Sequence, residues 1–293
     1  PRESPMKKYF ILALIPLLTN CGQKKTSLEE LDMTTVTVES ATSLLSGLAD
    51  DQSGDTYALY QSEPLNKINL ILNQAWASSC VRPIYSSCSN SARSQTYSSC
   101  QVGSTSLTMS GTASLSYSNS MCSLASLGSS VTRAYNVTFS GVRGGSLNIS
   151  SQSATDYKGN SYGGGGRLTT QSGGWTAEIL GKHKALSIKG VTVAQVSLRT
   201  LSPVNITGSL SRVSRVVNGG QIEVNYNRAQ ATAVIVPSNL QWSNTCCHPT
   251  SGTLAATWSG SRTGSSSITF TSCGQALVNE NGQERNIELS YCE

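Results

Sequence analysis

Apolar and polar residues alternate along most of the chain from residue 105 onward. Short runs place an apolar residue at every second position, with Ser, Thr, Asn or Lys between them. This alternation predicts β-strands with one buried and one solvated face, which is typical of antiparallel sheets. The runs are Leu107/Met109, Leu115/Tyr117, Tyr135/Val137/Phe139, Leu147/Ile149, Ala177/Ile179, Leu186/Ile188, Val191/Val193, Val204/Ile206, Ile222/Val224/Tyr226, Val234/Val236, Leu254/Ala256/Trp258, Ile268/Phe270 and Ile287/Leu289/Tyr291.

The number of these runs bears on the architecture. Roughly twelve to fifteen strands exceed what one open sheet usually carries, so residues 105–293 are predicted to form an antiparallel β-sandwich or a barrel-like sheet. Turn sequences separate the runs. Three of them are hairpin signals: the Arg-Gly-Gly-Ser stretch at 143–146, Asn218-Gly219 and Asn281-Gly282. The predicted fold class is therefore mainly β.

A helical period precedes the strands. Within residues 40–49, apolar residues fall three or four positions apart, as on one face of a helix. They are Ala41, Leu44, Leu45, Leu48 and Ala49. A second helix is predicted over 64–77, because Ser62-Glu63-Pro64 has the capping serine and early proline of a helix start. Residues 40–104 are thus expected to hold one or two short helices and a Ser-rich, Cys-containing loop region.

The first part of the chain has a different pattern. Lys7 and Lys8 precede an apolar run from Tyr9 to Leu18. The run is shorter than the about 20 apolar residues that a membrane-spanning helix needs, and Pro16 interrupts it. We therefore predict a signal peptide over residues 1–20, with Met6 as the expected start and residues 1–5 left out of structural reasoning.

The end of this run carries a recognisable motif. Leu18-Thr19-Asn20-Cys21 resembles the lipobox of bacterial lipoprotein precursors, with Asn20 where Gly, Ala or Ser is usual. The resemblance covers residues 6–21 alone. It implies that Cys21 becomes the amino-terminal residue and carries acyl chains such as palmitate, which together hold a protein stably in a bilayer. Gly22 after the cysteine implies the outer membrane, and residues 21–39 are then expected to form a lipidated tether.

The other cysteines form two clusters. An even number in an exported chain predicts four disulfides, with pairing expected inside each cluster. Adjacent cysteines form a strained ring, so Cys246 and Cys247 are not expected to pair with each other. The spacing lacks the C-x2-C pairs of zinc sites, and no metal site is predicted. The clusters are Cys80, Cys88, Cys100 and Cys122, and Cys246, Cys247, Cys273 and Cys292.

Charge narrows the classes of partner. The formal net charge is +5, and charged residues make up only 13% of the chain. Because the basic residues are scattered, no nucleic-acid partner is predicted. The pairs Arg212/Arg215 and Lys182/Lys184 are expected on solvated strand faces.

The chain offers few groups for catalysis. Residues 159–163 match the pattern G-x-S-x-G, but the glycines that follow disfavour the helix that this motif requires. The two histidines are His183 and His248. Glu178 and Glu223 fall on the polar side of predicted strands, where a solvated role is expected rather than the paired carboxylates of a glycosidase. We therefore predict a protein that is not an enzyme and uses no cofactor.

One glycine-rich loop stands out as a candidate contact surface. It runs from Asp156 to Arg167 and is expected to be flexible, with Tyr157, Tyr162 and Arg167 as candidate contact residues. Tyr and Gly suit recognition loops, although a plain mobile hairpin end has the same composition.

Together these patterns predict a lipid-anchored protein of the cell envelope. Its expected role is binding, adhesion or structural support, with a glycan or a protein as ligand. The alternative is a periplasm-facing lipoprotein that serves envelope assembly or lipid carriage, which predicts an apolar cavity inside the sheet. A hydrolase is the less favoured third reading.

Overall fold

We describe the fold from a computed structural model. It describes residues 33–53, 86–101, 108–141, 144–243, 246 and 248–289. The predictions on the signal peptide, on Cys21, on the helix over 64–77 and on Cys80, Cys247 and Cys292 lie outside these residues. Within the described ranges, no helix has the length and hydrophobicity that crossing a bilayer requires.

The dominant element is one sheet of fifteen strands, and every strand pair in it is antiparallel. This confirms the mainly β, antiparallel fold. The strands are β1 (Ala92–Gln101), β2 (Thr108–Tyr117), β3 (Ser130–Ser140), β4 (Gly145–Ser150), β7 (Gly165–Gln171), β8 (Gly174–Ile188), β9 (Val191–Ser202), β10 (Val204–Thr207), β11 (Val216–Asn218), β12 (Gln221–Tyr226), β13 (Ala231–Gln241), β14 (Ser251–Gly260), β15 (Gly264–Ser272), β16 (Gln275–Glu280) and β17 (Gln283–Glu288).

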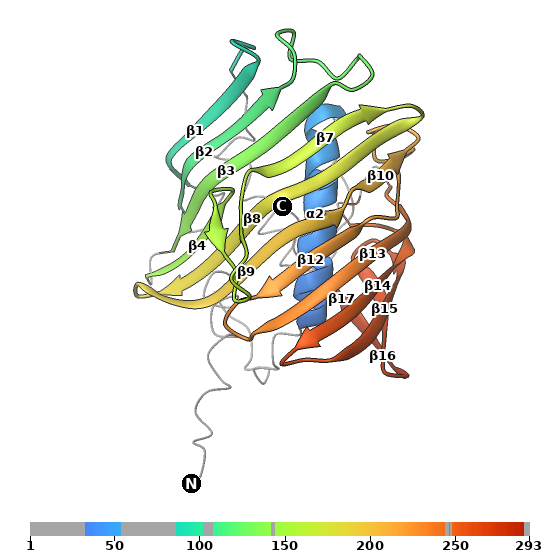
Figure 1. Cartoon of the computed structure of the whole chain (residues 1–293). Coiled ribbons are helices and arrows are strands. Elements are labelled where there is room, and N and C mark those ends of the chain that lie inside the picture. Colours follow the sequence, from blue (N-terminus) through green and yellow to red (C-terminus); the bar gives the residue numbers. More distant parts are fainter. Residues whose placement is uncertain are drawn as a thin grey trace.

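The order of the strands in space follows their order in the chain almost throughout. The sheet runs from β1 at one edge to β17 at the other, with β7, β9 and β12 filling in beside this path. Strands β5 (Ala154–Thr155) and β6 (Ser161–Tyr162) form a separate small hairpin. The large sheet curves, and helix α2 lies along its concave side (Figure 1).

Helix α2 spans Met33–Ser53, which is longer than the predicted 40–49. Its first turns lie in the segment that we expected to be tether. Threonine and valine are weak helix formers, so propensity alone does not reveal these turns. Contacts with the sheet compensate: the Tyr226 hydroxyl donates to the Met33 carbonyl at 2.8 Å and lies 2.6 Å from the Thr37 hydroxyl.

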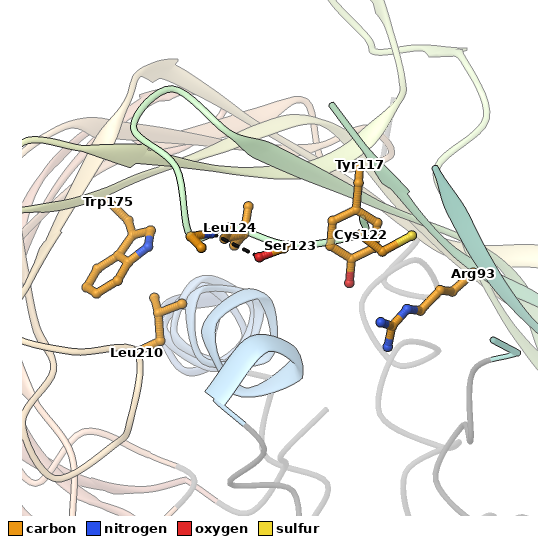
Figure 2. Close-up of a pocket in the computed structure, with 8 residues that line it drawn as sticks. Arg93, Tyr117, Cys122, Ser123, Leu124, Trp175 and Leu210 are labelled. Atoms are coloured by element: carbon orange, nitrogen blue, oxygen red, sulfur yellow. Dashed lines mark hydrogen bonds between the residues drawn. The ribbon is translucent and has the colours of Figure 1, made fainter. Parts of the chain in front are cut away.

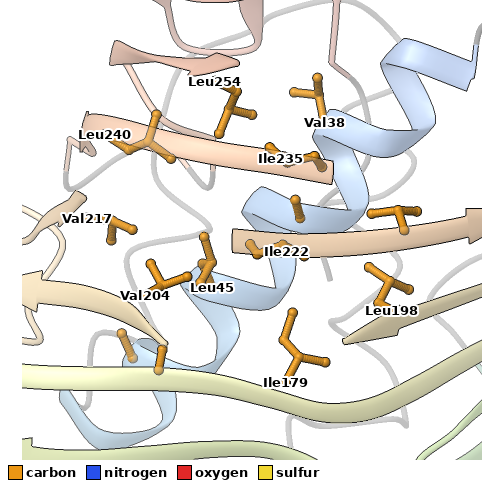
Figure 3. Close-up of a cluster of buried hydrophobic side chains, with 14 of the residues drawn as sticks. Val38, Leu45, Ile179, Leu198, Val204, Val217, Ile222, Ile235, Leu240 and Leu254 are labelled. Atoms are coloured by element: carbon orange, nitrogen blue, oxygen red, sulfur yellow. The ribbon is translucent and has the colours of Figure 1, made fainter. Parts of the chain in front are cut away.

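The main core lies between α2 and the sheet. Val38, Ala41, Leu45 and Ala49 form a fully buried stripe on the helix, which confirms the predicted face at the last three. Figure 3 shows Val38 and Leu45 pointing at side chains from several strands. These strand residues are Ile179, Leu198, Val204, Val217, Ile222, Ile235, Leu240 and Leu254, and all are buried.

One predicted hairpin is correct and another is wrong. Asn281 and Gly282 join β16 to β17, both with positive φ (52° and 84°), as a tight hairpin turn requires. Asn218-Gly219 is not a hairpin, because β11 and β12 both pair with β13 along one line. The glycines after β11 interrupt a strand rather than reverse it. A Cβ atom on Gly220 would lie 2.4 Å from the Pro203 carbonyl oxygen, so only glycine fits there.

Strand β13 shows the opposite face to the one predicted. Val234 and Val236 are partly exposed, whereas Ala233 and Ile235 are buried against the core. The sequence is apolar at both parities here, so alternation does not determine which face packs inward.

Two disulfides confirm pairing inside the clusters. Cys88 is bonded to Cys122, and Cys246 is bonded to Cys273 rather than to its neighbour Cys247. Cys100 is disulfide-bonded as well.

Candidate functional site

A dense group of buried polar side chains lies on the face of the sheet that points away from α2. In β12, Ile222, Val224 and Tyr226 belong to the core, so alternation turns Glu223 and Asn225 to the other face. The β5–β6 hairpin covers them there, since Lys158, Tyr162 and Asp156 all contact Glu223 or Asn225. We call this group the hairpin network.

Asp156 holds the turn of the hairpin in shape. Its carboxylate accepts hydrogen bonds from the backbone N–H groups of Lys158 and Asn160, both at 2.9 Å. It also accepts from the side-chain amide of Asn225 on β12, at 3.2 Å. One carboxylate therefore shapes the turn and ties it to the sheet.

Glu223 is the second carboxylate of the network. It is 5% exposed and pairs with two cations: Lys158 Nζ lies 3.0 Å from Oε2, and Arg199 Nε lies 2.9 Å from Oε1. The Asn225 amide nitrogen lies 3.0 Å from the same Oε1 atom. The expectation of a solvated Glu223 is wrong. The side chain points away from the core as predicted, but the hairpin covers it.

His183 and Tyr162 connect the hairpin to β8 and β9. The rings of these two residues stack with centroids 5.3 Å apart, and the Arg199 guanidinium lies 4.8 Å from the Tyr162 ring centroid. His183 Nε2 is 2.8 Å from the Tyr162 carbonyl oxygen, and Nδ1 is 2.9 Å from the Ser197 hydroxyl. Nε2 thus contacts the hairpin, while Nδ1 contacts β9 of the sheet.

Burial and hydrogen bonding shift the pKa values of Asp156 and Glu223 in opposite directions. Burial by itself raises the pKa of Asp156, but hydrogen bonds from Asn160 and Lys158 outweigh it, and the pKa lies below its ordinary value. Burial likewise raises the pKa of Glu223, and the interactions with Lys158, Asn225 and Arg199 more than reverse it. Both groups are thus ionised near neutral pH.

The pKa of Tyr162, in contrast, lies above its ordinary value. Burial raises the pKa of its phenol, and the charge of Asp156 acts in the same direction. The neutral hydroxyl accepts a hydrogen bond from the Asn225 amide at 3.1 Å.

The predicted contact residues serve different roles in the structure. Tyr162 is buried in the network and presents no free ring. The Tyr157 hydroxyl lies 2.7 Å from that of Thr232. Arg167 pairs with Glu178 on the next strand through two donors, at 2.9 and 2.7 Å, and 40% of its side chain stays exposed. Residues 154–162 of this stretch therefore form a hairpin that packs on the sheet and has a partly exposed outer side.

Two groups of reactive side chains differ from the Ser-His-carboxylate triad of serine hydrolases. Ser161, in the G-x-S-x-G stretch, lies on β6 and its hydroxyl is 3.1 Å from that of Ser153. The buried Ser197–His183 pair has the Tyr162 carbonyl, rather than a carboxylate, on the other ring nitrogen. Among the described residues, no three His, Cys, Asp or Glu side chains gather closely enough to hold a metal ion.

A cavity of about 390 Å³ lies beside one end of α2 (Figure 2). We call it the helix-end cavity. Figure 2 looks along the helix, with Trp175 and Leu210 on one side and Tyr117, Cys122 and Arg93 on the other. The loop between β2 and β3 lines the space between them, with Ser123, Leu124 and Ala125. Sequence reasoning missed this site because it is assembled from β1, β2, β8 and two loops.

Several basic residues are buried where the sequence suggested solvent. Lys182 and both Arg212 and Arg215 have at most 3% of their surface exposed, so the predicted solvated pairs are wrong for these three. Two of these cations make cation–π contacts. Lys182 Nζ lies 5.0 Å from the Tyr135 ring centroid, and the Arg215 guanidinium lies 4.8 Å from the Trp242 ring centroid. The alternation of apolar and polar residues in the sequence does not predict these cation–π contacts.

Comparison with known proteins gives no further assignment. No family model matches the chain, and neither the curated proteins nor the solved structures contain a match to it.

Proposed function

We propose that this protein is a non-catalytic, lipid-anchored component of the bacterial cell envelope. In this proposal Cys21 carries the lipid in the outer membrane, and the outward face of the β-sheet binds a glycan or a protein at the cell surface. The lipobox-like residues 18–21 support the anchor. The geometry of the outward face supports the binding role.

The observation that carries the binding role is the fastening of the hairpin. Lys158 of the hairpin pairs with Glu223 of the sheet at 3.0 Å, and the Asn225 amide on the sheet donates to Asp156 of the hairpin at 3.2 Å. Lys158, Tyr157 and Arg167 remain partly exposed on this rigid base, with one third of the Lys158 side chain accessible. A surface that is already ordered loses little conformational entropy on binding, which favours recognition.

The concave side favours display of a surface over lipid carriage. The fully buried stripe of α2 fills the described interior of the sheet, where a carrier would hold an acyl chain. The helix-end cavity lies beside it, and the lining of this cavity includes an arginine and a serine.

Protease treatment of intact cells tests the location and the anchor together. We expect added protease to remove the protein from intact cells, and the Cys21→Ala variant to appear in the soluble fraction. Lysed cells provide the control for cleavage. Protection until lysis would favour the periplasmic alternative, and a Cys21→Ala variant that stays with the membrane would contradict the anchor.

A further inference from the structure

We propose that the helix-end cavity binds a small organic carboxylate with a compact apolar body, such as an arylalkanoate. This site lies at the end of the interior and differs from the outward face discussed above. The inference does not depend on the lipid anchor or on the surface ligand.

The charge of the cavity points to an anion. Arg93 is the charged residue among the described residues that line it. Its Nε atom is buried and has no hydrogen-bond partner in the described part of the chain. The guanidinium lies 5.8 Å from the centroid of the Tyr117 ring, a contact that leaves its donors available. A buried donor without an acceptor is costly, and a carboxylate supplies two acceptor oxygens to a guanidinium.

The opposite side of the cavity is apolar. Leu210 is buried there, while Trp175 and Leu124 line the space and are partly exposed. Figure 2 shows Trp175 and Leu210 across the helix end from Arg93. A ligand with an aromatic or branched body would contact this side while its charged group reaches the arginine. The two ends of the site thus select for an amphiphilic anion.

The loop over the cavity is held in place from both sides. The Cys88–Cys122 disulfide ties its first part to the segment before β1. The Thr170 hydroxyl on β7 donates to the Leu124 carbonyl at 2.9 Å, and the Asn119 amide donates to the Ser123 carbonyl at 2.7 Å. These bonds keep the lining ordered without a ligand, as in most small-molecule sites.

The volume limits the size of the ligand. Small-molecule sites commonly measure about 300–1,000 Å³, and the helix-end cavity falls near the lower end of that range. The buried stripe of α2 closes the route into the core. A short arylalkanoate therefore fits the site better than a long fatty acid.

Calorimetry with matched probes tests the proposal. The full chain carrying Cys21→Ala is used so that no detergent is needed. We expect 4-phenylbutyrate to bind with a Kd of about 1 mM or tighter, which is reasonable for a ligand of this size. The neutral analogue 4-phenylbutanol should bind at least about tenfold more weakly, because it lacks the charge-assisted hydrogen bonds. Equal binding of acid and alcohol, or no binding of the acid at about 10 mM, would overturn the proposal.

Two variants locate the binding. Arg93→Gln should remove the preference for the acid, whereas Arg228→Gln, at an exposed arginine in the turn between β12 and β13, should keep it. A preference that survives Arg93→Gln contradicts the assignment.

A further variant guards against a folding defect in Arg93→Gln. Ala125 is exposed and lines the cavity, so Ala125→Phe narrows the space without disturbing the core. We expect it to weaken binding of the acid by about tenfold or more, with an unchanged melting temperature. Unchanged affinity in a folded Ala125→Phe variant would place the ligand elsewhere and overturn the proposal.

Discussion

The two faces of the central strands bury different kinds of side chain. On one face of β12, Ile222, Val224 and Tyr226 pack toward α2; on the other, Glu223 and Asn225 lie beneath the hairpin. The apolar face is stabilised by removal of hydrocarbon from water, which needs shape but little direction. The polar face is stabilised only if each donor meets an acceptor. We therefore expect the apolar face to dominate stability and the polar face to fix where the hairpin lies.

The largest effect is expected from the apolar face. Leu45→Ala should lower the free energy of unfolding by about 2–5 kcal/mol, because Leu45 is fully buried and its removal leaves a cavity. Urea titration followed by tryptophan fluorescence measures this change. Leu201→Ala, at a side chain that is 46% exposed, serves as the control and should change stability by less than about 0.5 kcal/mol. Similar values for the two variants would mean that α2 does not pack against the sheet as described.

The stability of the protein in acid should depend on His248, a buried histidine that belongs to neither face of β12. Burial, with the nearby charge of Arg212, lowers the pKa of His248 to about 4. The unfolded chain binds a proton near pH 6.5 and the folded chain does not, so stability should fall as pH drops from about 6.5 to about 4. The slope should approach about 1.4 kcal/mol per pH unit. Urea titrations across this range measure it, and a His248→Gln variant should show a flatter profile. An equally steep profile in that variant would contradict the assignment.

Removing one charge from the hairpin network should have a smaller effect than opening the core. Glu223→Gln leaves Lys158 and Arg199 without their carboxylate, and we expect a loss of about 1–3 kcal/mol. Glu284→Gln, at an exposed position on β17, is the matched control. If the two variants are equally stable, the hairpin network fixes where the hairpin lies but adds little to the free energy of unfolding.

The Glu223→Gln variant should also change how stability depends on pH in acid. Because the pKa of Glu223 is lowered on folding, its contribution is present above its unfolded pKa of about 4.5 and is lost as pH falls through the lower folded value. Glu223→Gln should therefore lose less stability than the parent below pH 4.5. This window lies below most of the one that His248 governs, so the two groups can be separated.

The smallest effect concerns a single hydroxyl. Tyr157→Phe removes the contact with Thr232 and should cost about 0.5–1.5 kcal/mol. Amide hydrogen exchange in residues 154–162 measures the local opening of the hairpin. Ser267→Ala, at an exposed hydroxyl on β15, should leave this exchange unchanged. Faster exchange in both variants would indicate a general rather than a local effect.

Sequence reasoning succeeds where neighbouring residues decide the outcome. Alternation identified the strands around Leu115, Ile179 and Ile268, and all three side chains are buried. The tight turn at Asn281-Gly282 follows from the positive φ angles that these residues tolerate. Both results depend on residues close together in the chain.

It fails where distant segments meet. Asn225 contacts Asp156 across 69 positions and Lys158 reaches Glu223 across 65, so no local pattern marks Glu223 as buried. The first turns of α2 depend in the same way on Tyr226, a residue 189 positions from Thr37. The residues that line the helix-end cavity are spread between Arg93 and Leu210. No local sequence pattern in these segments predicts that they form a cavity together.

The seating of α2 has a mechanical consequence. If Cys21 is the anchor as proposed, the twelve positions from Cys21 to Met33 span at most about 40 Å. Tension on the tether would then enter the fold at the first turn of α2, where Thr34 accepts a hydrogen bond from Arg262 at 2.8 Å. The hydrogen bonds from Arg262 and Tyr226, together with the buried stripe, would pass this force from the helix to the sheet. A pull from the membrane would thus be resisted in shear by the whole length of the core.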